Sequence, residues 1–372
     1  MRLLDRYLLR ELLVPLGYCL CGFLIFWIAF DLFNELSRFQ GHKLKALEVA
    51  EYYLVKLPEL LSIVLPVALL LALLYSLTNL ARHHELIAIR AAGVSIWRLS
   101  APYLVVGVVL SLALFALTEL WSVDAQAAGD RILNRHLADQ PDAAARQWQS
   151  KLHFHNDRDA RNWDIGEYHL LTGEMKNPVV EWQLPDGTRR QIFAERAAWT
   201  NGVWTFYNVA QLVYRAPDDT PPAMRTNELA FAEFSETPEQ IKIEIKITGM
   251  SALKAAKKPR FSIAEILAYQ RLHPKLKPDV QALLGTQLHG RLAAPWTCLV
   301  VVFIALPFGT LSGRRNVFVG VASSIFICFA FFVLTRVGLA LGTSGKLLPW
   351  LAAWLPNLVF GGAGVGLTWR VR

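Results

Sequence analysis

Several groups of residues have types and spacings that could support chemistry, but none of them completes a site. His83-His84-Glu85 offers metal ligands, yet adjacent helical residues point about 100° apart, so the two histidines cannot easily share one ion. His153 and His155 share one face of a predicted strand, where a solvated or packed face is favoured over a zinc site because a third ligand is missing. Residues 285–290 have the glycine spacing of a phosphate-binding loop, but Arg291-Leu292 follows where Lys and then Ser or Thr are required. The sequence predicts no catalytic residue, no metal and no cofactor.

The segment from Ser76 to Ser100 has a pattern that suits protein docking. It is short, basic and compatible with a helix, and it lies between two long apolar runs. Apolar and charged residues alternate along it until a glycine interrupts the pattern. A plain turn between two membrane helices does not need such a pattern, so we predict a surface that docks onto a soluble partner. The residues that we expect to carry it are Arg82, Glu85, Ile89, Arg90 and Gly93.

Charged residues within apolar runs are the other functional candidates, because they are expensive to place in a membrane. Asp31, Glu35 and Arg38 fall on one stripe of a helix by their spacing of three and four residues. Arg336 is expected near the outer end of another span, and Lys43 and Lys45 follow the first. Two interpretations stay open: simple snorkelling to the interface, or a charged lining for an anionic lipid headgroup that includes a gate between the first and fifth helices.

Composition defines the elements that must position these residues. Hydrophobic residues make up 54% of the 372 residues and charged residues 18%, against about 25% in a soluble domain. Apolar runs of about 20 residues can cross a bilayer. The sequence predicts six membrane helices, with one polar insertion between the third and fourth. The spans are expected at residues 12–33, 55–77, 101–121, 292–310, 317–341 and 350–368.

The net charge of +8 does not indicate nucleic-acid binding, because the basic residues gather in particular connections. They precede the first span, separate the second from the third, join the fourth to the fifth and close the chain. With six crossings all four segments fall on one side, which the positive-inside rule makes the cytoplasm. Both termini are then cytoplasmic and the insertion is extracytoplasmic. The basic residues concerned are Arg2, Arg6, Arg10, Arg82, Arg90, Arg98, Arg314, Arg315, Arg370 and Arg372.

The insertion is expected to be rich in antiparallel strands. Leu152 and Phe154 alternate with polar residues, and Asn201-Gly202 suits a type I′ hairpin turn between strands at 191–199 and 203–207. Pro185-Asp186-Gly187 is a turn signal, and residues 241–247 alternate as a further strand. No helix is expected before Ser262, which with Glu265 forms a capping box. We predict an antiparallel sandwich or open barrel of the jelly-roll type.

The expected organisation is therefore a helical membrane protein with an inserted all-β domain. Residues 1–122 hold the first three spans and the docking helix at about 79–97. Residues 123–287 hold the β-domain and a short connecting helix, and residues 288–372 hold the last three spans.

Several motifs resemble the permeases LptF and LptG of lipopolysaccharide export. Glu85, the run Arg90-Ala91-Ala92-Gly93 and Ser95 resemble the coupling helix of that family, and Arg6-Tyr7-Leu8 resembles its N-terminus. Trp354-Leu355-Pro356-Asn357 and the preceding 288–309 region resemble its C-terminal third. A looser likeness to its β-jelly-roll domain runs from Ala194 to Trp204, and the residues after Glu119 depart from the family's usual proline-containing segment.

The resemblance implies a permease subunit of an ATP-driven ABC transporter in the bacterial inner membrane. It implies a pair with a paralogous permease of the LptF or LptG type, a cytoplasmic ATPase dimer of the LptB type, a single-helix jelly-roll subunit of the LptC type and a periplasmic bridge of the LptA type. Lipopolysaccharide would enter between a first helix of one permease and a fifth helix of its partner. It would leave through an apolar groove of the β-domain, which we expect inward residues such as Phe193 and Trp204 to line.

Two rival classes make different predictions. A non-transporting mechanotransmission or scaffold subunit with a periplasmic sensing domain predicts a filled membrane interior and a β-domain without an accessible apolar groove. A membrane-bound lipid-modifying enzyme predicts a cluster of catalytic polar groups at headgroup level, which the sequence does not show.

Overall fold

The computed structural model describes residues 3–133, 135, 148–170, 172–184, 186–215, 221–252, 261–274, 276–310 and 317–370. The chain divides into two compact units. The helical unit contains Met1–Asn134 and Pro278–Arg372, and the β-unit contains Arg135–Lys277. Among the residues named above, Arg2, Pro185, Arg314, Arg315 and Arg372 lie outside the described part of the chain.

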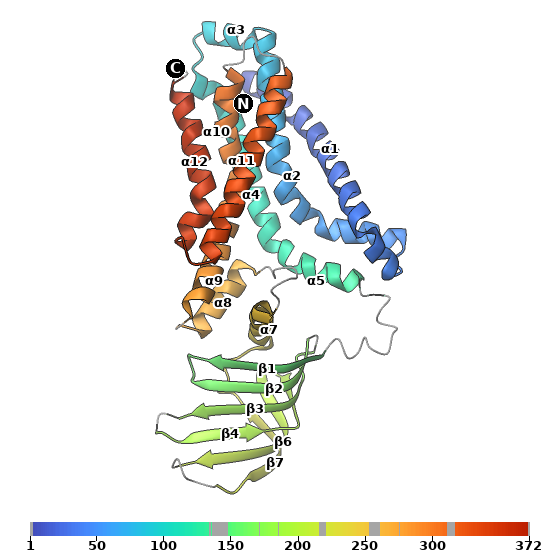
Figure 1. The fold of residues 1–372 in the computed structure, drawn as a ribbon, viewed down its shortest axis with the longest axis vertical. Helices are drawn as coiled ribbons and strands as arrows, with labels where there is room; N and C mark the ends of the chain where they lie inside the picture. Colours follow the sequence, from blue (N-terminus) through green and yellow to red (C-terminus); the bar gives the residue numbers. More distant parts are fainter. Residues whose placement is uncertain are drawn as a thin grey trace. The chain divides into compact units, whose positions relative to one another are not determined.

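Six helices of the helical unit are long and apolar enough to cross a membrane, as the sequence predicts. The first three are α1 (Leu3–Gly41), α2 (Ala46–Arg82) and α4 (Ile96–Leu120), with the short α3 (Glu85–Ala91) between α2 and α4. The fourth span runs from Pro278 to Pro307 and the last two are α11 (Val317–Thr343) and α12 (Pro349–Arg370). The beginning of α1 and the end of α12 lie at the same end of this unit as α3 (Figure 1).

Helix α2 lies at the centre of the helical unit. It contacts α1, α3, α4, α10 and α11. Within its apolar membrane-spanning stretch, 67% of the residues are buried. In α1 and α11 only 11% of the residues of this stretch are buried, so few of their apolar residues pack inside the chain. Leu8, Leu12 and Leu16 are the buried residues by which the first half of α1 packs on α2.

The fourth span is broken near its middle. It consists of α9 (Pro278–Ala293), a 3-10 turn η2 (Ala294–Trp296) and α10 (Thr297–Thr310). Pro295 lies within the break, where its missing N–H and fixed φ disrupt the α-helical pattern. Asn357 of α12 is buried and donates a hydrogen bond of 2.7 Å to the carbonyl of Ala293. This gives the Trp354–Asn357 motif a structural role: it satisfies a carbonyl at the end of α9.

Close approaches between helices explain the Gly-x-x-x-Gly pair of α11, Gly338 and Gly342, but not that of α12, Gly362 and Gly366. A Cβ added at Gly338 would lie 2.5 Å from the carbonyl oxygen of Ala352, and one at Gly342 would lie 2.6 Å from the Cβ of Ala352. At Gly362 and Gly366, by contrast, a Cβ would meet nothing within 4 Å. The close contact of α12 with α10 is made by Gly364 instead, whose added Cβ would lie 2.7 Å from the carbonyl of Phe303.

A further helix, α5 (Ser122–Leu133), was not predicted. It contacts α2 and α4, and Ile132 and Leu133 are buried in one cluster with Phe39, Tyr52 and Tyr53. The segment therefore belongs to the helical unit, which ends about ten residues later than the sequence boundary at residue 122 suggested. Short helices with few consecutive apolar residues are easily read as polar connections.

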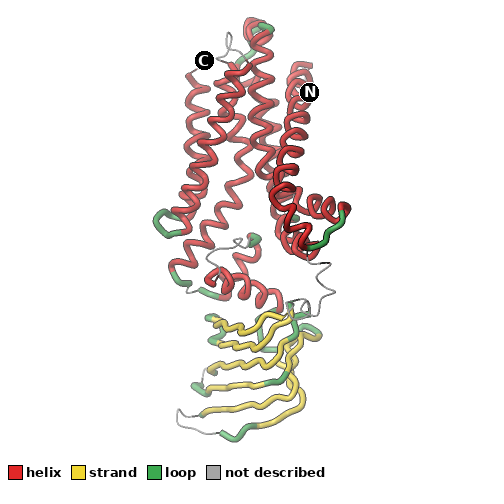
Figure 2. Tube along the Cα trace, turned by 45° about the vertical axis from the view of Figure 1, so that its right-hand side comes forward, coloured by secondary structure: helices red, strands yellow, loops and turns green. Residues whose placement is uncertain are grey.

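The β-unit contains one antiparallel sheet of seven strands (Figure 2). The strands run in the order β1-β2-β3-β4-β6-β5, with β7 paired to β6 and an additional pairing between β3 and β5. Their bounds are β1 Trp148–Asn156, β2 Arg161–His169, β3 Met175–Gln183, β4 Arg189–Phe193, β5 Arg196–Thr200, β6 Val203–Tyr214 and β7 Met224–Phe231. An antiparallel β-domain inserted between helical halves confirms the predicted fold class.

Two strand predictions in this unit are wrong in detail. The strand expected at 191–199 is two strands, β4 and β5, separated at Ala194-Glu195. Residues 241–247 form part of a helix, α7 (Pro238–Ala252). Thr237 and Gln240 cap its start reciprocally, with bonds of 2.8 and 3.3 Å, and Pro238 occupies its first position. That capping signal was present in the sequence, whereas the alternation of Ile and charged residues pointed to a strand.

A row of unusual backbone angles crosses the sheet where β4 and β5 separate. The ladder register places Lys151, Gly166, Asn177, Glu195 and Asn208 opposite one another on successive strands. Three of these residues have positive φ angles, 55° at Lys151, 49° at Asn177 and 52° at Asn208. We call these five residues the bend row, because left-handed residues interrupt a strand's regular extension and the strands curve along their length (Figure 2).

Helices α7 and α8 (Ile263–Leu272) are joined by a buried polar cluster. The predicted capping box at the start of α8 is confirmed, with Ser262 and Glu265 exchanging bonds of 2.8 and 2.9 Å. At its end, His273 Nε2 lies 2.5 Å from Oε1 of Glu244 on α7, and its Nδ1 lies 3.4 Å from Asp157. Burial raises the pKa of Glu244. Burial also tends to lower the pKa of His273, but the bond and charge of Glu244, then those of Asp157, outweigh it and raise that pKa.

We expect the two glycine pairs to respond differently to alanine. Gly338→Ala puts a methyl group against the Ala352 carbonyl, and overpacking of this kind costs about 1–3 kcal/mol. Gly362→Ala is the matched control, because its methyl group would enter open space. Thermal unfolding of the purified chain in detergent, followed by circular dichroism, should show a lower midpoint for Gly338→Ala alone. Equal midpoints for both variants would contradict the packing described.

The α7–α8 contact should weaken as pH rises. His273 stabilises the α7–α8 contact fully below pH 6.5. This stabilisation is lost as pH rises through the raised pKa of His273 in the folded chain. The raised pKa of Glu244 acts in the same direction above 4.5. Hydrogen exchange of the α7 and α8 amides, corrected for intrinsic rates, should report an opening free energy that falls as pH rises above 6.5, the ordinary pKa of His273. The double variant Glu244→Gln/His273→Asn should be flat, and an unchanged slope would disprove this role.

Candidate functional site

Helix α3 is a short helix between two residues with left-handed backbone conformation. His84 before it has φ 58° and Gly93 after it has φ 81°, both in the left-handed region. Ser95 then caps α4, with its Oγ accepting from the amide of Arg98 at 3.3 Å. The docking helix expected at about 79–97 is therefore the end of α2, the seven residues of α3 and the beginning of α4.

The structure distinguishes two faces of α3. Leu86 is buried and Ile89 packs partly against the core of the helical unit. Ile87 is 61% exposed, and Arg82 and Arg90 are exposed with it. Ile89 is thus on the inner side of α3 rather than its outer side, and Ile87 is the apolar residue that α3 presents. The alternation in the sequence indicated two faces, but not which of them turns outward.

Two polar contacts join the beginning of α1 to this region. The hydroxyl of Tyr7 donates to Oε2 of Glu85 at 2.8 Å. Arg98, in the first turn of α4, pairs with Asp5 at 2.9 Å. Sequence analysis placed Glu85 on the docking surface but found neither partner, because contacts between residues 78 and 93 positions apart leave no local pattern.

The charged stripe at the far end of α1 is paired within the chain. Asp31 accepts a hydrogen bond of 3.1 Å from Tyr53 of α2, and Arg38 pairs with Glu35 at 3.2 Å. The stripe inferred from spacing therefore turns toward α2. Lys43 and Lys45 are exposed in the connection to α2, where they leave a positive surface beside the paired residues.

Arg336 is exposed on α11 among exposed apolar side chains. Its guanidinium lies 4.9 Å from the centroid of the Phe332 ring, and Val333 and Val337 are exposed beside it. A cation on an otherwise apolar helix face is costly in lipid, and stacking on one ring offsets only part of that cost. Asp31 is hydrogen-bonded to Tyr53 of its own chain, and the expected contact of Arg336 with an acid of a partner permease stays a prediction.

The two residues expected to line an inner groove of the β-unit lie in different environments. Trp204 is fully buried, and its Nε1 donates to the carbonyl of Glu236 at 2.6 Å. Phe193 is 39% exposed while its neighbour Ile192 is fully buried, so Phe193 faces away from the core. The inward direction expected for Phe193 is wrong because the strand phase is set by Ile192.

Residues 232–237, which we call the covering segment, fill the inner face of the sheet. Phe234 packs against the rings of Trp163, Trp182 and Phe206. Glu236 is 1% exposed and accepts from Arg161, Asn156 and Trp163 at 2.5, 2.7 and 3.1 Å. The arrangement compensates a buried carboxylate that would otherwise be strongly unfavourable.

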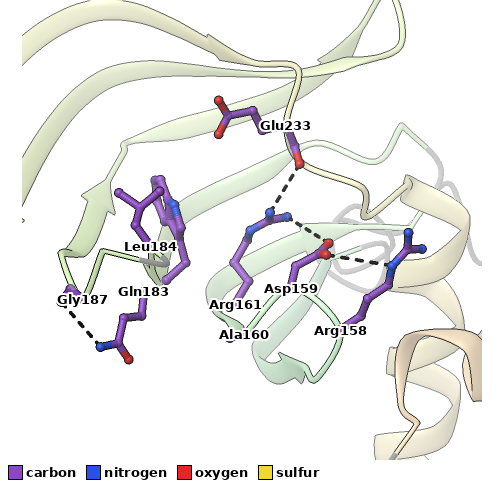
Figure 3. Close-up of a pocket in the computed structure, with 9 residues that line it drawn as sticks. Arg158, Asp159, Ala160, Arg161, Gln183, Leu184, Gly187 and Glu233 are labelled. Atoms are coloured by element: carbon purple, nitrogen blue, oxygen red, sulfur yellow. Dashed lines mark hydrogen bonds and ion pairs between the residues drawn. The ribbon is translucent and has the colours of Figure 1, made fainter.

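Beside the covering segment lies an open pocket of about 610 Å³ (Figure 3). Arg161 donates to the carbonyl of Glu233 at 3.3 Å across it, and Trp182 and Leu184 line one side. Arg158 and Asp159 lie on the other side. The pocket has both charges and does not include Trp204 or Phe193, so it is not the expected apolar groove.

The described residues contain no group of three His, Cys, Asp or Glu side chains that could hold a metal ion. His155 Nδ1 lies 2.5 Å from Oδ1 of Asn162 on the neighbouring strand, and it is exposed. The main exposed features of the described residues are the turn helix α3 and the apolar side chains of α1 and α11.

A comparison with protein families bears on these surfaces together. Residues 6–370 match the family described as lipopolysaccharide export system permease LptF/LptG. No curated protein matches the sequence. The match includes α3, all six candidate spans and the β-unit, so the chain is a multi-pass membrane protein that belongs to the LptF/LptG family of lipopolysaccharide export permeases.

Proposed function

We propose that this chain is one permease subunit of an ATP-driven exporter that moves lipopolysaccharide from the inner membrane toward a periplasmic bridge. The observation that carries the proposal is the family match over residues 6–370, which includes both membrane halves and the β-unit. In this proposal the chain pairs with a paralogous permease, and an ATPase dimer binds on the cytoplasmic side. A single-helix jelly-roll subunit and a soluble bridge protein receive the lipid.

An energy source is needed because exposing acyl chains to water costs about 0.8 kcal/mol for each CH₂ group. The helical unit has an exposed surface on which a separate ATPase can dock. The end of α2 and helix α3 offer an exposed surface of Arg82, Ile87 and Arg90 beside the intramolecular Glu85–Tyr7 bond. We assign ATP hydrolysis to the partner and its docking to this surface, with Gly93 allowing the sharp exit from α3.

The outer helices support lateral lipid contact. Among the six candidate spans, α1 and α11 have the smallest fraction of buried residues in their apolar stretch, 11% each. We propose that α1 of one permease meets α11 of the other and that lipid enters between them. Arg336 then contacts a lipid phosphate or an acid across this seam, and Arg38, Lys43 and Lys45 provide positive charge near the outer surface.

The orientation follows from the same proposal. Basic residues of the first connection, including Arg82, Arg90 and Arg98, lie at the end of the helical unit where α1 begins. That end is assigned to the cytoplasm by the positive-inside rule, with both termini there. The β-unit is then periplasmic.

The covered inner face of the sheet is an observation that favours the scaffold alternative. Trp204 is inaccessible while residues 232–237 cover it, so no apolar groove is open there. Transport through the β-unit therefore requires the covering segment to move. The transport proposal and the scaffold alternative differ on this movement, which can be tested directly.

Substitutions on the outer face of α3 should release the ATPase. Arg90→Glu and Ile87→Asp place acids on the proposed interface, where truncating a central contact typically costs 2 kcal/mol or more, about thirtyfold in affinity. The recovery of ATPase on affinity-purified permease, measured by quantitative blotting, should fall at least about tenfold. Arg158→Glu, on the β-unit, is the matched charge reversal and should retain full recovery. Equal recovery in all variants would remove α3 from the interface.

Locking the covering segment should block lipid contact in the β-unit. Ser235 Oγ lies 2.5 Å from Oδ2 of Asp159, so Ser235→Cys/Asp159→Cys places two thiols side by side. A photoreactive aromatic residue at position 204 should capture lipid in the reduced transporter with ATP. Oxidation should abolish capture, and reduction should restore it.

The matched control for this experiment is the same probe at position 193, which faces outward. Capture at 193 but never at 204, in the oxidised and reduced states alike, would argue for a structural β-domain and for the scaffold alternative.

A further inference from the structure

The contacts at the beginning of α1 suggest how movement of α3 reaches the lipid-facing helix. Helix α1 exposes most of its apolar surface, but its first half is fixed to the rest of the unit. Leu8, Leu12 and Leu16 pack on the core. The same buried cluster contains Leu86 of α3, so apolar packing holds both helices in place.

The connection between α1 and α3 is polar and directional. Tyr7 Oη donates to Glu85 Oε2 at 2.8 Å, and Glu85 is the first residue of α3. The left-handed residues His84 and Gly93 delimit α3 as a separate short helix between α2 and α4. A hydrogen bond to a charged acceptor is among the stronger side-chain contacts, typically about 1.5–3 kcal/mol.

A second contact joins the exit from α3 to the same turn of α1. Arg98 follows the Ser95 cap of α4 by three residues and pairs with Asp5 at 2.9 Å. Asp5 and Tyr7 lie within the first five residues of α1. The two ends of the α3 segment are therefore both held by the beginning of the same helix.

We propose that Tyr7 and Asp5 are positioning residues that transmit displacement of α3 to α1 through Glu85 and Arg98. This inference deepens the proposed function and rests on it for what moves α3, whereas the mechanical connection itself belongs to this chain alone. Tyr7 acts through Glu85 and does not itself need to touch ATP, the ATPase or lipid. Movement of α1 then changes the lipid-facing surface at the far end of the same helix.

The first test measures the connection without any transport. Spin labels at Ile87→Cys on α3 and Val14→Cys on α1, with the four native cysteines replaced, report one distance in the full chain in nanodiscs. Tyr7→Phe removes only the hydroxyl, and it should broaden the distance distribution at least about twofold, because the charged hydrogen bond is lost. Tyr18→Phe is the matched control, since Tyr18 is on the same helix and 77% exposed. Unchanged width in Tyr7→Phe would overturn the inference.

The second test measures coupling in the assembled transporter. Tyr7→Phe should retain the ATPase rate while lowering lipid released per ATP several-fold, and Tyr75→Phe, at a residue of α2 that is 45% exposed, should leave that ratio unchanged. A wild-type ratio in Tyr7→Phe would overturn the inference even if the distances broaden. If the wild-type complex hydrolyses ATP but moves no lipid, the proposed function fails, while the distance measurement still decides whether Tyr7 connects α3 to α1.

Discussion

The burial of α2 is the constraint on which the helical unit depends. A membrane helix must satisfy its backbone internally and find packing partners without a strong hydrophobic drive, so small residues and close contacts decide which helices associate. Helix α2 provides these contacts to both halves of the chain, which a long insertion separates in sequence. With α2 at the centre, α1 and α11 remain at the periphery with their apolar faces exposed. The surfaces proposed for lipid contact are therefore the apolar faces of α1 and α11 that do not pack inside the chain.

Polar contacts then select particular arrangements within this apolar framework. Asn357 satisfies the carbonyl at the end of α9, Glu85 and Asp5 hold the beginning of α1, and Glu236 is enclosed by three donors in the β-unit. Each acts where apolar packing alone would allow several registers. For the two buried groups, Asn357 and Glu236, removing the partner leaves a buried polar atom unsatisfied, so these contacts specify geometry more than they add net stability.

Sequence patterns predicted the elements whose signals are local. Hydropathy gave all six spans, Ser262 with Glu265 gave the beginning of α8, and Asn201-Gly202 gave a hairpin whose residues have φ angles of 52° and 82°. Two predictions failed because the sequence supported more than one structure. The alternation at 241–247 indicated a strand although Thr237 and Gln240 cap a helix there. The direction of Phe193 depended on a break after β4, at Ala194. The partners of Glu85 and Glu236 could not be predicted, because they depend on which distant segments meet.

The bend row has a consequence for how the β-domain can diversify. The strands bend at the left-handed backbone positions Lys151, Asn177 and Asn208, which lie on alternating strands. The side chains on the faces of the sheet do not determine this bend. Shape and lining are therefore specified by different positions. Mutations can exchange aromatic for aliphatic or polar side chains while the bend persists, so the surface of the sheet can change without a change of its backbone.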